Sequence, residues 1–345
     1  MNRYSKQIQL EGIGIEGQEK LSNARVLVVG SGGLGSAVIP YLAGAGVGTI
    51  GIAEGDVVET SNLHRQIIYK ENDLGFSKAK KAATFIQGLN SEIEAHAYSL
   101  FLTGENAKSI FTSYDIIVDA TDSIPVRLMI NETAEHLGQP VVYASVYKYE
   151  AQLSVFNYQD GPTYSDVFGT DNRSLSNCVE VGVLGTTVGI IGTMQAHEVL
   201  KMILGIGRVL SGKLLVYNGL TNEQNVFTIK KRERAEEQDK KSALNDSLPC
   251  LVSAEEAFAS ENTEIIDIRE SVEVPHFDSA IVKKVPLSIL DPYMKTIPTD
   301  RPVYFLCQTG MRSLLAARQY RNQGYQAKSI EGGIIQIQKQ WTYET

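Results

Sequence analysis

The sequence has few cysteines and no long apolar run, and each absence excludes a class of protein. Its 345 residues include three cysteines, Cys178, Cys250 and Cys307, and no CxxC pair. They cannot build a four-thiolate zinc site or a disulfide framework. No apolar segment has the length that spans a bilayer, and the amino-terminal residues lack the apolar core of a signal peptide. We therefore expect a cytoplasmic protein with reduced cysteines.

Positive charge is also scarce. The 32 lysines and arginines are outnumbered by 40 aspartates and glutamates, so the formal charge is -8 and the pI is near 5.3. This balance provides no basic field, and we therefore expect neither nucleic acid nor an anionic membrane as a partner. The length predicts about two domains, each large enough to bury a core.

The first two thirds of the chain predict an α/β fold. The segment ARVLVVGSGGLGSAVIPYLAGAGVGTIGIAEGD predicts a buried strand, a glycine turn, a helix and a second strand that ends near Glu54. The segments YDIIVDATDS, PVVYASV and KLLVYNG predict further strands, and residues 181–205 predict a largely buried helix. We expect a Rossmann-like, doubly wound and mostly parallel sheet.

A charge run with almost no apolar content predicts a linker over residues 232–247. Beyond it, LVSAEEAFAS predicts a helix with Ser253 as its N-cap, TEIIDIRE and RPVYFLC predict strands, and another helix is expected from about Arg312. The sequence therefore predicts one domain over residues 1–231 and a smaller α/β domain over residues 248–345.

A glycine-rich turn lies between the first strand and the first long helix. In GSGGLGS, the glycines Gly30, Gly32, Gly33 and Gly35 let the backbone approach phosphates, and the helix N-terminus offers N–H groups to negative charge. Glu54, about twenty residues on, is positioned to accept hydrogen bonds from ribose hydroxyls. The turn alone indicates a nucleotide, and an NAD-dependent oxidoreductase is one alternative.

The residues after Glu54 favour a different chemistry. Asn62 and Arg65 follow in DVVETSNLHRQ, and Lys78 follows in GFSKAKKA. Two cations near bound phosphates suit phosphoryl or adenylyl transfer, because negative charge develops on the phosphates, whereas hydride transfer does not need them. Taken singly, Arg65 could be a surface ion-pair partner and Lys78 a solvated helix residue.

Taken together, these motifs resemble the MoeB/ThiF family of ubiquitin-activating-enzyme-like adenylyltransferases over about residues 1–230. They are RYSKQ, GSGGLGS, SNLHRQ, the downstream lysine, and DATDS followed by Arg127 and Asn131. The resemblance implies ATP and Mg²⁺ as cofactors and a ubiquitin-like β-grasp sulfur carrier ending in Gly-Gly as partner. The carrier's C-terminal carboxylate would attack the α-phosphate to give an acyl-adenylate and pyrophosphate.

The resemblance also implies residue roles. Glycines of the turn, Gly33 above all, would contact the nucleotide, Glu54 the ribose, and Asn62, Arg65 and Lys78 the phosphates. Asp122 would bind Mg²⁺, with Ser123 beside it in the ATP site. An acid at the carboxyl end of a strand suits a hard cation that bridges phosphates, whereas Asp119 is expected to be internal. Lys6 would be offered to the ATP of the neighbouring subunit in a homodimer.

The sequence departs from the family pattern at several positions. Most relatives have a zinc site made of two CxxC pairs, but Thr163 and Asp166 occupy the place of the first pair and the second pair is absent. We expect no zinc, and packing must then stabilise this region. Lys6 replaces a common arginine, which removes bidentate phosphate geometry, and Ser123 replaces a common asparagine.

The cysteine of RSLSNCVEVGVLG, Cys178, has two interpretations. In several family members a cysteine at this place attacks the adenylate or exchanges with a persulfide, and in others it is dispensable. A small buried apolar residue is the alternative. The polar neighbours indicate an accessible loop, so we predict a catalytic role.

Residues 248–345 resemble the single-domain rhodaneses. The resemblance lies in CQTGMRS, in a D-x-R-E motif, in the segment from His276 to Ala280 and in the closing SIEGGI. Backbone N–H groups and a helix N-terminus around Cys307 would lower its pKa and stabilise a persulfide. Arg312 would add positive charge to this loop, or pair with an acid such as Asp267.

Joined in one chain, the two halves predict an adenylyltransferase and sulfurtransferase. A persulfide donor would load Cys307, and its sulfur would convert the acyl-adenylate to a thiocarboxylate, as in molybdopterin, thiamine or tRNA-thiolation pathways. The alternative is an adenylyltransferase whose second domain is a docking or regulatory module.

Overall fold

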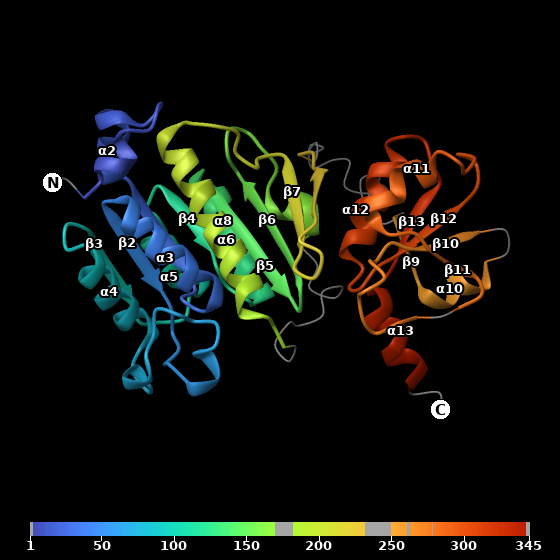
Figure 1. The fold of residues 1–345 in the computed structure, drawn as a ribbon, viewed down its shortest axis with the longest axis horizontal. Helices are drawn as coiled ribbons and strands as arrows, with labels where there is room; N and C mark the ends of the chain where they lie inside the picture. Colours follow the sequence, from blue (N-terminus) through green and yellow to red (C-terminus); the bar gives the residue numbers. More distant parts are fainter. Residues whose placement is uncertain (1–2, 170–181, 232–249, 261–262, 278, 343–345) are drawn as a thin grey trace. The chain divides into compact units, whose positions relative to one another are not determined.

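The computed structural model describes residues 3–169, 182–231, 250–260, 263–277 and 279–342, with side chains up to residue 338. The described residues form two compact units, one up to residue 231 and one from residue 250 (Figure 1). Each unit has its own sheet. The predicted linker and Cys178 lie outside the described residues.

The first unit is built on an eight-stranded sheet in the order β3-β2-β1-β4-β5-β6-β7-β8. Neighbours from β3 to β5 pair in parallel, and those from β5 to β8 pair antiparallel. The strands are β1 (Arg25–Val29), β2 (Thr49–Ala53), β3 (Glu94–Tyr98), β4 (Ile116–Asp119), β5 (Val141–Tyr147), β6 (Glu150–Phe156), β7 (Lys213–Asn218) and β8 (Gln224–Thr228).

The described helices of this unit connect and cover these strands. The α-helices are α1 (Ser5–Ile8), α2 (Gly14–Asn23), α3 (Gly33–Ala45), α4 (Lys78–Leu89), α5 (Gly104–Phe111), α6 (Ile124–Leu137), α7 (Tyr164–Phe168) and α8 (Gly185–Leu204). Two short 3-10 turns, η1 (Thr60–Asn62) and η2 (Glu71–Asp73), lie between β2 and α4. The predicted doubly wound, mostly parallel sheet is confirmed.

The core explains why the apolar segments fold in this way. Alternate strand residues such as Val26, Val28 and Val118 form one buried cluster with α3 and α8, which pack against each other. Leu27 and Ile117, which point to the opposite face of the sheet, are also fully buried. A sheet buried on both faces needs continuous apolar strands, and this is the pattern in the sequence.

The strand order reverses between β1 and β4. From β1 the chain passes through α3 to β2 and then through α4 to β3, on one side of β1. It returns through α5 to β4, on the other side of β1, and passes through α6 to β5. Since parallel crossovers are right-handed, the helices that follow β1 and β4 leave toward opposite faces of the sheet. A crevice therefore opens at the carboxyl ends of these two strands, where open α/β sheets bind ligands.

The antiparallel edge was only partly predicted. KLLVYNG was expected as a strand and forms β7, but β6 and β8 were not expected. The sequence of β6 alternates polar and apolar residues up to Val155, and Ala151, Leu153 and Val155 are fully buried. Its turn from β5, however, has none of the glycine or asparagine signals of a hairpin, which conceals the strand in the sequence.

The helix α7 begins at the Thr163–Asp166 segment, where the family resemblance would place a zinc-binding cysteine pair. Thr163 is its N-cap and accepts a hydrogen bond from the Asp166 N–H at 3.3 Å, while Asp166 accepts one from the Thr163 N–H at 2.8 Å. The rings of Tyr143, Phe156 and Tyr164 pack together beside it, with centroids 5.5–5.9 Å apart. A capping box and an aromatic cluster thus stabilise this turn.

The second unit has a five-stranded parallel sheet in the order β11-β10-β12-β13-β9. Its strands are β9 (Leu251–Val252), β10 (Glu264–Asp267), β11 (Val282–Lys284), β12 (Val303–Leu306) and β13 (Ala327–Ile330). Its helices are α10 (Ala254–Ala259), α11 (Leu290–Met294), α12 (Met311–Arg321) and α13 (Gly333–Thr342), with the 3-10 turn η6 (Leu287–Ile289). The prediction of Ser253 as the N-cap of α10 is confirmed, since its Oγ accepts the Glu256 N–H at 3.1 Å.

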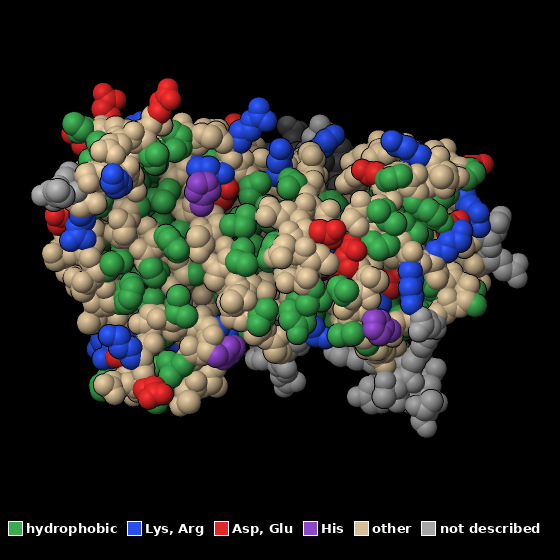
Figure 2. Space-filling model, viewed as in Figure 1, with side chains coloured by type: hydrophobic (Ala, Val, Ile, Leu, Met, Phe, Trp, Pro, Cys, Tyr) green, Lys and Arg blue, Asp and Glu red, His purple; other side chains and the backbone are tan. Residues whose placement is uncertain are grey.

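Charged side chains of both signs are interspersed over the face of the molecule drawn in Figure 2. The negative net charge is therefore not gathered in one area of that face. Among the described residues, no helix combines the length and the apolar character that a membrane crossing requires.

The capping box of α7 leads to a stability prediction. Thr163→Ala removes the side-chain acceptor for the Asp166 N–H and should lower the free energy of unfolding of the first unit by about 1 kcal/mol. Thr163→Ser keeps the hydroxyl and should retain most of the stability that the alanine variant loses. Hydrogen exchange of peptides from the large sheet measures the change in this unit separately. Equal stability of the alanine and serine variants would contradict the role of the cap.

Candidate functional site

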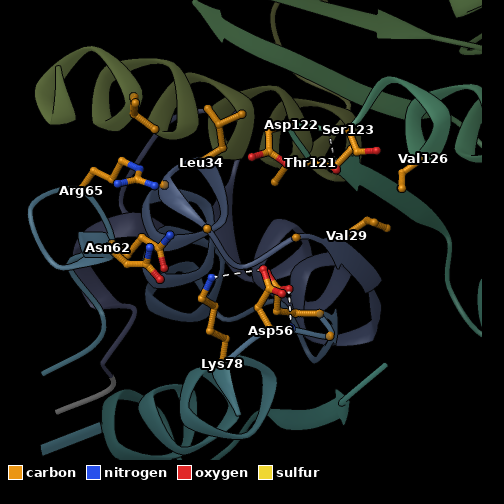
Figure 3. A pocket seen from close by; sticks show the side chains of 18 of the residues that line it. Val29, Leu34, Asp56, Asn62, Arg65, Lys78, Thr121, Asp122, Ser123 and Val126 are labelled. Carbon is orange, nitrogen blue, oxygen red and sulfur yellow. Dashed lines mark hydrogen bonds and ion pairs between the residues drawn. The ribbon is translucent and has the colours of Figure 1, made fainter. Parts of the chain in front are cut away.

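A cavity of about 560 Å³ opens at the reversal point of the large sheet (Figure 3). Nine of the predicted nucleotide-site residues line it: Gly30, Gly32, Gly33, Glu54, Asn62, Arg65, Lys78, Asp122 and Ser123. Two predicted residues do not line it. Lys6 is exposed on α1, and Gly35 lies within the first turn of α3. Residues that follow three neighbouring strands, β2, β1 and β4, are thereby gathered with Lys78 of α4 around one space.

The glycine turn has the close backbone approach that its sequence predicts. Gly30 has a φ of +90°, and a Cβ there would lie 2.7 Å from the carbonyl oxygen of Ala120. A Cβ on Gly35 would lie 2.2 Å from the carbonyl oxygen of Gly30, so Gly35 allows α3 to pack against the turn. Gly32 is the N-cap of α3, and the N–H groups of its first turn are available to an anion.

The carboxylate of Glu54 is oriented by backbone donors. Its Oε2 accepts the Ser31 N–H at 3.0 Å, and its Oε1 accepts the Asp56 N–H at 3.0 Å. Each oxygen of a carboxylate can accept a second hydrogen bond. A fixed carboxylate beside the phosphate turn is therefore suited to hold two ribose hydroxyls.

Lys78 and Arg65 bring positive charge to the cavity. Lys78 is only 6% exposed and its Nζ lies 3.5 Å from Asp56 Oδ2, which excludes the solvated helix lysine considered above. The Nη1 of Arg65 donates to the Ser61 carbonyl oxygen at 3.0 Å, so the guanidinium is positioned by its own turn. Asn62, which precedes Arg65 in the same turn, is buried and lines the same cavity (Figure 3).

The two acids of DATDS have different environments. Asp122 is exposed at the cavity and forms no ion pair with any residue in the described ranges. Asp119, at the end of β4, is 2% exposed, and burial raises its pKa to about 6 although Arg127 and the Thr121 N–H oppose the shift. The prediction that Asp119 is internal is confirmed.

Arg127 and Asn131 stabilise the loops around the cavity. Arg127 is buried and donates to the Thr121 carbonyl oxygen at 2.6 Å and to Ser145 Oγ at 3.1 Å, which ties the loop after β4 to β5. Asn131 accepts the Tyr164 N–H at 2.9 Å at the start of α7. Of these two family-motif residues, only Arg127 lines the cavity.

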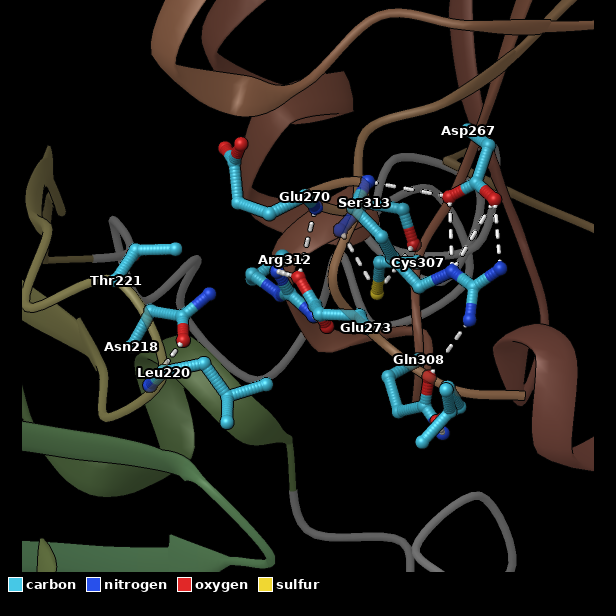
Figure 4. Close-up of polar contacts among 12 residues, drawn as sticks. Asn218, Leu220, Thr221, Asp267, Glu270, Glu273, Cys307, Gln308, Arg312 and Ser313 are labelled. Atoms are coloured by element: carbon cyan, nitrogen blue, oxygen red, sulfur yellow. Dashed lines mark hydrogen bonds and ion pairs between the residues drawn. The ribbon is translucent and has the colours of Figure 1, made fainter. Parts of the chain in front are cut away.

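The second unit places Cys307 directly before the first turn of α12. The Sγ of Cys307 accepts the Gly310 N–H at 3.2 Å and the Ser313 N–H at 3.4 Å, and the side chain is buried (Figure 4). Gly310 has a φ of +88°, which turns its N–H toward the sulfur. Such donors favour a thiolate over a thiol.

The start of α13 fastens the same loop from its other side. The Ile334 N–H donates to the Cys307 carbonyl oxygen at 2.9 Å, and the Ile335 N–H donates to the Gln308 carbonyl oxygen at 3.3 Å. A Cβ on Gly333 would lie 2.3 Å from the Cys307 carbonyl oxygen, at a φ of +61°. The double glycine of SIEGGI therefore lets α13 approach the cysteine loop.

The ion pairs around the Cys307 loop differ from one of the two predictions for Arg312, a pair with Asp267. Arg312 forms a bidentate pair with Glu273, with Nη1 2.7 Å from Oε1, and not with Asp267. Asp267 is instead bonded by Arg269, whose Nη2 lies 2.8 Å from Oδ2 and whose Nη1 donates to Gln308 Oε1 at 2.9 Å (Figure 4). The reason is proximity, because Arg269 follows Asp267 by two residues at the end of β10.

Sequence reasoning missed several residues that shape the two sites. Arg269 and Glu273 support the cysteine loop, and the D-x-R-E motif was the available signal for Arg269. Phe101 and Lys148 line the nucleotide cavity from segments far along the chain. No motif marks either residue, since only the sheet order brings their segments to the cavity.

These features define the class. The first unit is a doubly wound α/β fold in which a glycine turn, a carboxylate fixed by backbone donors and two cations line one cavity, and it is followed by a second α/β unit with a cysteine in a backbone N–H cradle. The family model described as "ThiF family" matches residues 4–241. The chain belongs to the ThiF family.

Two relatives support this assignment, and one solved structure shares the fold. The chain is 36% identical to the probable adenylyltransferase/sulfurtransferase MoeZ of Mycobacterium tuberculosis over 98% of this chain and 93% of that protein. It is 41% identical to the sulfur carrier protein adenylyltransferase of Thermus thermophilus over 68% of this chain and 89% of that protein. The fold resembles E. coli MccB crystallised with ATP, with a TM-score of 0.58 at 22% identity over 67% of this chain and 72% of MccB.

The burial of Asp119 leads to a pH prediction. Its folded pKa of about 6 lies above the unfolded value near 3.8. Between these values the folded state binds the extra proton, so the contribution of this group to stability falls as the pH rises. Asp119→Asn cannot titrate. The stability of this variant relative to the wild type should therefore increase by about 2 kcal/mol from pH 4 to pH 7.

Hydrogen exchange of β1 and β4 peptides at several pH values measures this difference within the first unit. Any constant offset from the lost contact with Arg127 cancels, because only the slope with pH is compared. A difference that stays constant from pH 4 to pH 7 would contradict the raised pKa.

Proposed function

We propose that the first unit adenylates the C-terminal glycine carboxylate of a ubiquitin-like sulfur carrier ending in Gly-Gly, and that the second unit supplies persulfide sulfur to the product. One observation carries this function: Glu54, Arg65, Lys78 and Asp122 line a single cavity beside the glycine turn. The relatives named as adenylyltransferase/sulfurtransferase and as sulfur carrier protein adenylyltransferase support it.

In the adenylation step the carrier carboxylate attacks the α-phosphorus of ATP. A bond forms between a carboxylate oxygen and phosphorus, and the bond to the bridging oxygen breaks, so pyrophosphate leaves with the electron pair. Glu54 orients the ribose, and Gly30, Gly32, Gly33 and the N-terminus of α3 contact the phosphates. Arg65 and Lys78 neutralise charge on the leaving pyrophosphate, and the Asn62 amide donates a hydrogen bond to it.

The donor set at the cavity suits Mg²⁺. This ion binds proteins through one or two carboxylates and takes its other ligands from phosphates and water. Asp122, an exposed carboxylate at the cavity, would be the protein ligand, with Ser123 beside it. When bound, Mg²⁺ supplies positive charge that offsets the charge developing on the phosphates.

Sulfur transfer would follow in the second unit. The Cys307 thiolate attacks the outer sulfur of a persulfide donor, and the donor leaves as a thiolate. The terminal sulfur on Cys307 then attacks the acyl carbon and expels AMP, which gives an acyl disulfide. Attack of a second thiol on the Cys307 sulfur releases the thiocarboxylate and leaves a disulfide for a cellular dithiol to reduce.

We propose that Cys178 provides that second thiol. We also propose that Arg312 provides positive charge to the loop that carries Cys307. We also propose a homodimer in which Lys6 reaches the ATP of the partner subunit, because Lys6 is exposed and does not line the cavity of its own chain. The exchange of thiols and persulfides requires a reducing compartment, which favours the cytoplasm.

One observation favours the alternative, an adenylyltransferase whose second unit is a docking or regulatory module. The side chain of Cys307 is 0% exposed, whereas a sulfur donor has to reach its Sγ. The two candidate functions share the adenylation step and differ only in the chemistry of this cysteine.

The adenylation step predicts a specific effect at Lys78. Lys78→Met should lower kcat/KM for carrier-dependent ATP–pyrophosphate exchange by about 100- to 1000-fold, because the leaving phosphates lose a buried cation. Lys80→Met is the matched control, since Lys80 is exposed on the same helix. Equal loss in both variants, or no loss at Lys78, would contradict the assignment.

The sulfur step predicts a covalent product. After incubation with a low-molecular-weight persulfide, peptide mass spectrometry should detect one added sulfur atom on Cys307. Cys307→Ser should abolish the addition and Cys250→Ser should leave it intact. If the wild-type protein gains no sulfur at Cys307, the sulfurtransferase proposal is wrong and the docking alternative stands.

A further inference from the structure

The hairpin between β5 and β6 brings an additional cation to the nucleotide cavity. Val146, Tyr147 and Lys148 line the cavity together, and Lys148 begins the two-residue turn that joins the strands. Its φ is +55°, in the left-handed region that a residue with a side chain adopts at an energetic cost. Residues in such conformations gather at functional sites, because the surrounding structure must compensate for them.

Lys148 differs from the other cations of the cavity in its partners. Arg65 donates to the Ser61 carbonyl oxygen, Lys78 pairs with Asp56, and Arg127 donates to the loop after β4. The ammonium of Lys148 lies 5.8 Å from the centre of the Tyr147 ring and forms no hydrogen bond or ion pair with the residues that the structure describes. Its positive charge is therefore available to an anionic ligand.

The strand order determines which end of the cavity Lys148 occupies. The strands β2, β1, β4 and β5 are consecutive neighbours, and Glu54, the glycine turn, Asp122 and Lys148 follow them in that order. Neighbouring strands are about 4.8 Å apart, so β5 lies roughly 10 Å from β1 across the sheet, on the far side of β4. Asp119 at the end of β4 pairs with Tyr143, so β5 continues past the end of β4 and Lys148 lines the cavity from beyond that end. Arg65, Asn62 and Lys78 are on the other side of the cavity from Asp122 and Ser123 (Figure 3).

We propose that Lys148 binds the C-terminal carboxylate of the acyl substrate while it attacks the α-phosphate, and this assignment rests on the proposed function. In a displacement at phosphorus, the attacking and leaving oxygens are roughly in line. Pyrophosphate that leaves toward Arg65, Asn62 and Lys78 requires a carboxylate that arrives from the opposite side, where the hairpin lies. A cation there reduces the repulsion between the carboxylate and the phosphates.

The reaction itself is unchanged by this assignment. The carboxylate oxygen forms the bond to phosphorus and pyrophosphate takes the electron pair of the broken bond, while Lys148 exchanges no proton or electron with either. Its contribution is to the binding and orientation of the acyl substrate. The effect of its removal should therefore appear in the KM for the carrier and not in the affinity for ATP.

The experiment compares carrier-dependent ATP–pyrophosphate exchange in the full-length wild type, Lys148→Met, Lys148→Arg and Lys108→Met. The probe is a small β-grasp protein ending in Gly-Gly, and the same protein with one added C-terminal serine is its control. Lys108 is exposed on α5 and does not line the cavity. Lys148→Met should raise the KM for the probe by about 10- to 100-fold and leave the KM for ATP unchanged. In Lys148→Arg the KM for the probe should be close to that of the wild type, and Lys108→Met should match the wild type.

Each other outcome overturns the assignment. A raised KM for ATP, alone or equally with the probe, would make Lys148 a phosphate ligand, and an unchanged KM for the probe would give it no role in binding. Direct binding of ATP to Lys148→Met, at wild-type affinity, verifies that the variant is folded, and the arginine variant repeats the test with the charge retained. If the wild-type protein shows no ATP–pyrophosphate exchange that depends on the probe, the proposed function is wrong, and this assignment is overturned with it.

Discussion

The reversal of strand order between β1 and β4 is the constraint on which the first unit depends. Because the helices that follow these strands leave toward opposite faces, no backbone fills the space at their carboxyl ends. The glycine turn, Glu54, Asp122 and the β5–β6 hairpin all face this space from adjacent strand ends. Buried polar contacts then fix the loops, as when Arg127 ties the loop after β4 to Ser145 on β5.

The two units use the same physical device for different chemistry. In the first, the N-terminus of α3 and a turn with Gly30 in the left-handed region expose N–H groups beside a nucleotide cavity. In the second, the turn before α12, with Gly310 in the left-handed region, directs N–H groups at the Sγ of Cys307. In both, backbone donors at a helix start favour negative charge. Adenylation followed by sulfur transfer needs both kinds of anion, a phosphate and a thiolate.

Much of the fold and most of the nucleotide cavity could be predicted from local signals. Continuous apolar runs marked the parallel strands, and a glycine turn between a strand and a helix marked the phosphate site. The antiparallel strand β6 was missed because the hairpin turn at Lys148 and Tyr149 has no glycine or asparagine. The partner of Arg312 could not be predicted either, since Glu273 lies 39 residues earlier in the chain. Long-range pairs depend on loop paths that no local pattern records.

The sequence by itself determined the residue types and the local geometry: which glycines form turns, which segments are strands or helices, and which acids and cations follow the strand ends. These properties depend on backbone sterics and on periodicity, which act over a few residues. Only the tertiary structure decided which strand ends are neighbours, that burial raises the pKa of Asp119, and that Lys148 faces the nucleotide cavity. Burial and proximity arise from packing between distant segments, and the pKa and role of a charged group follow from them.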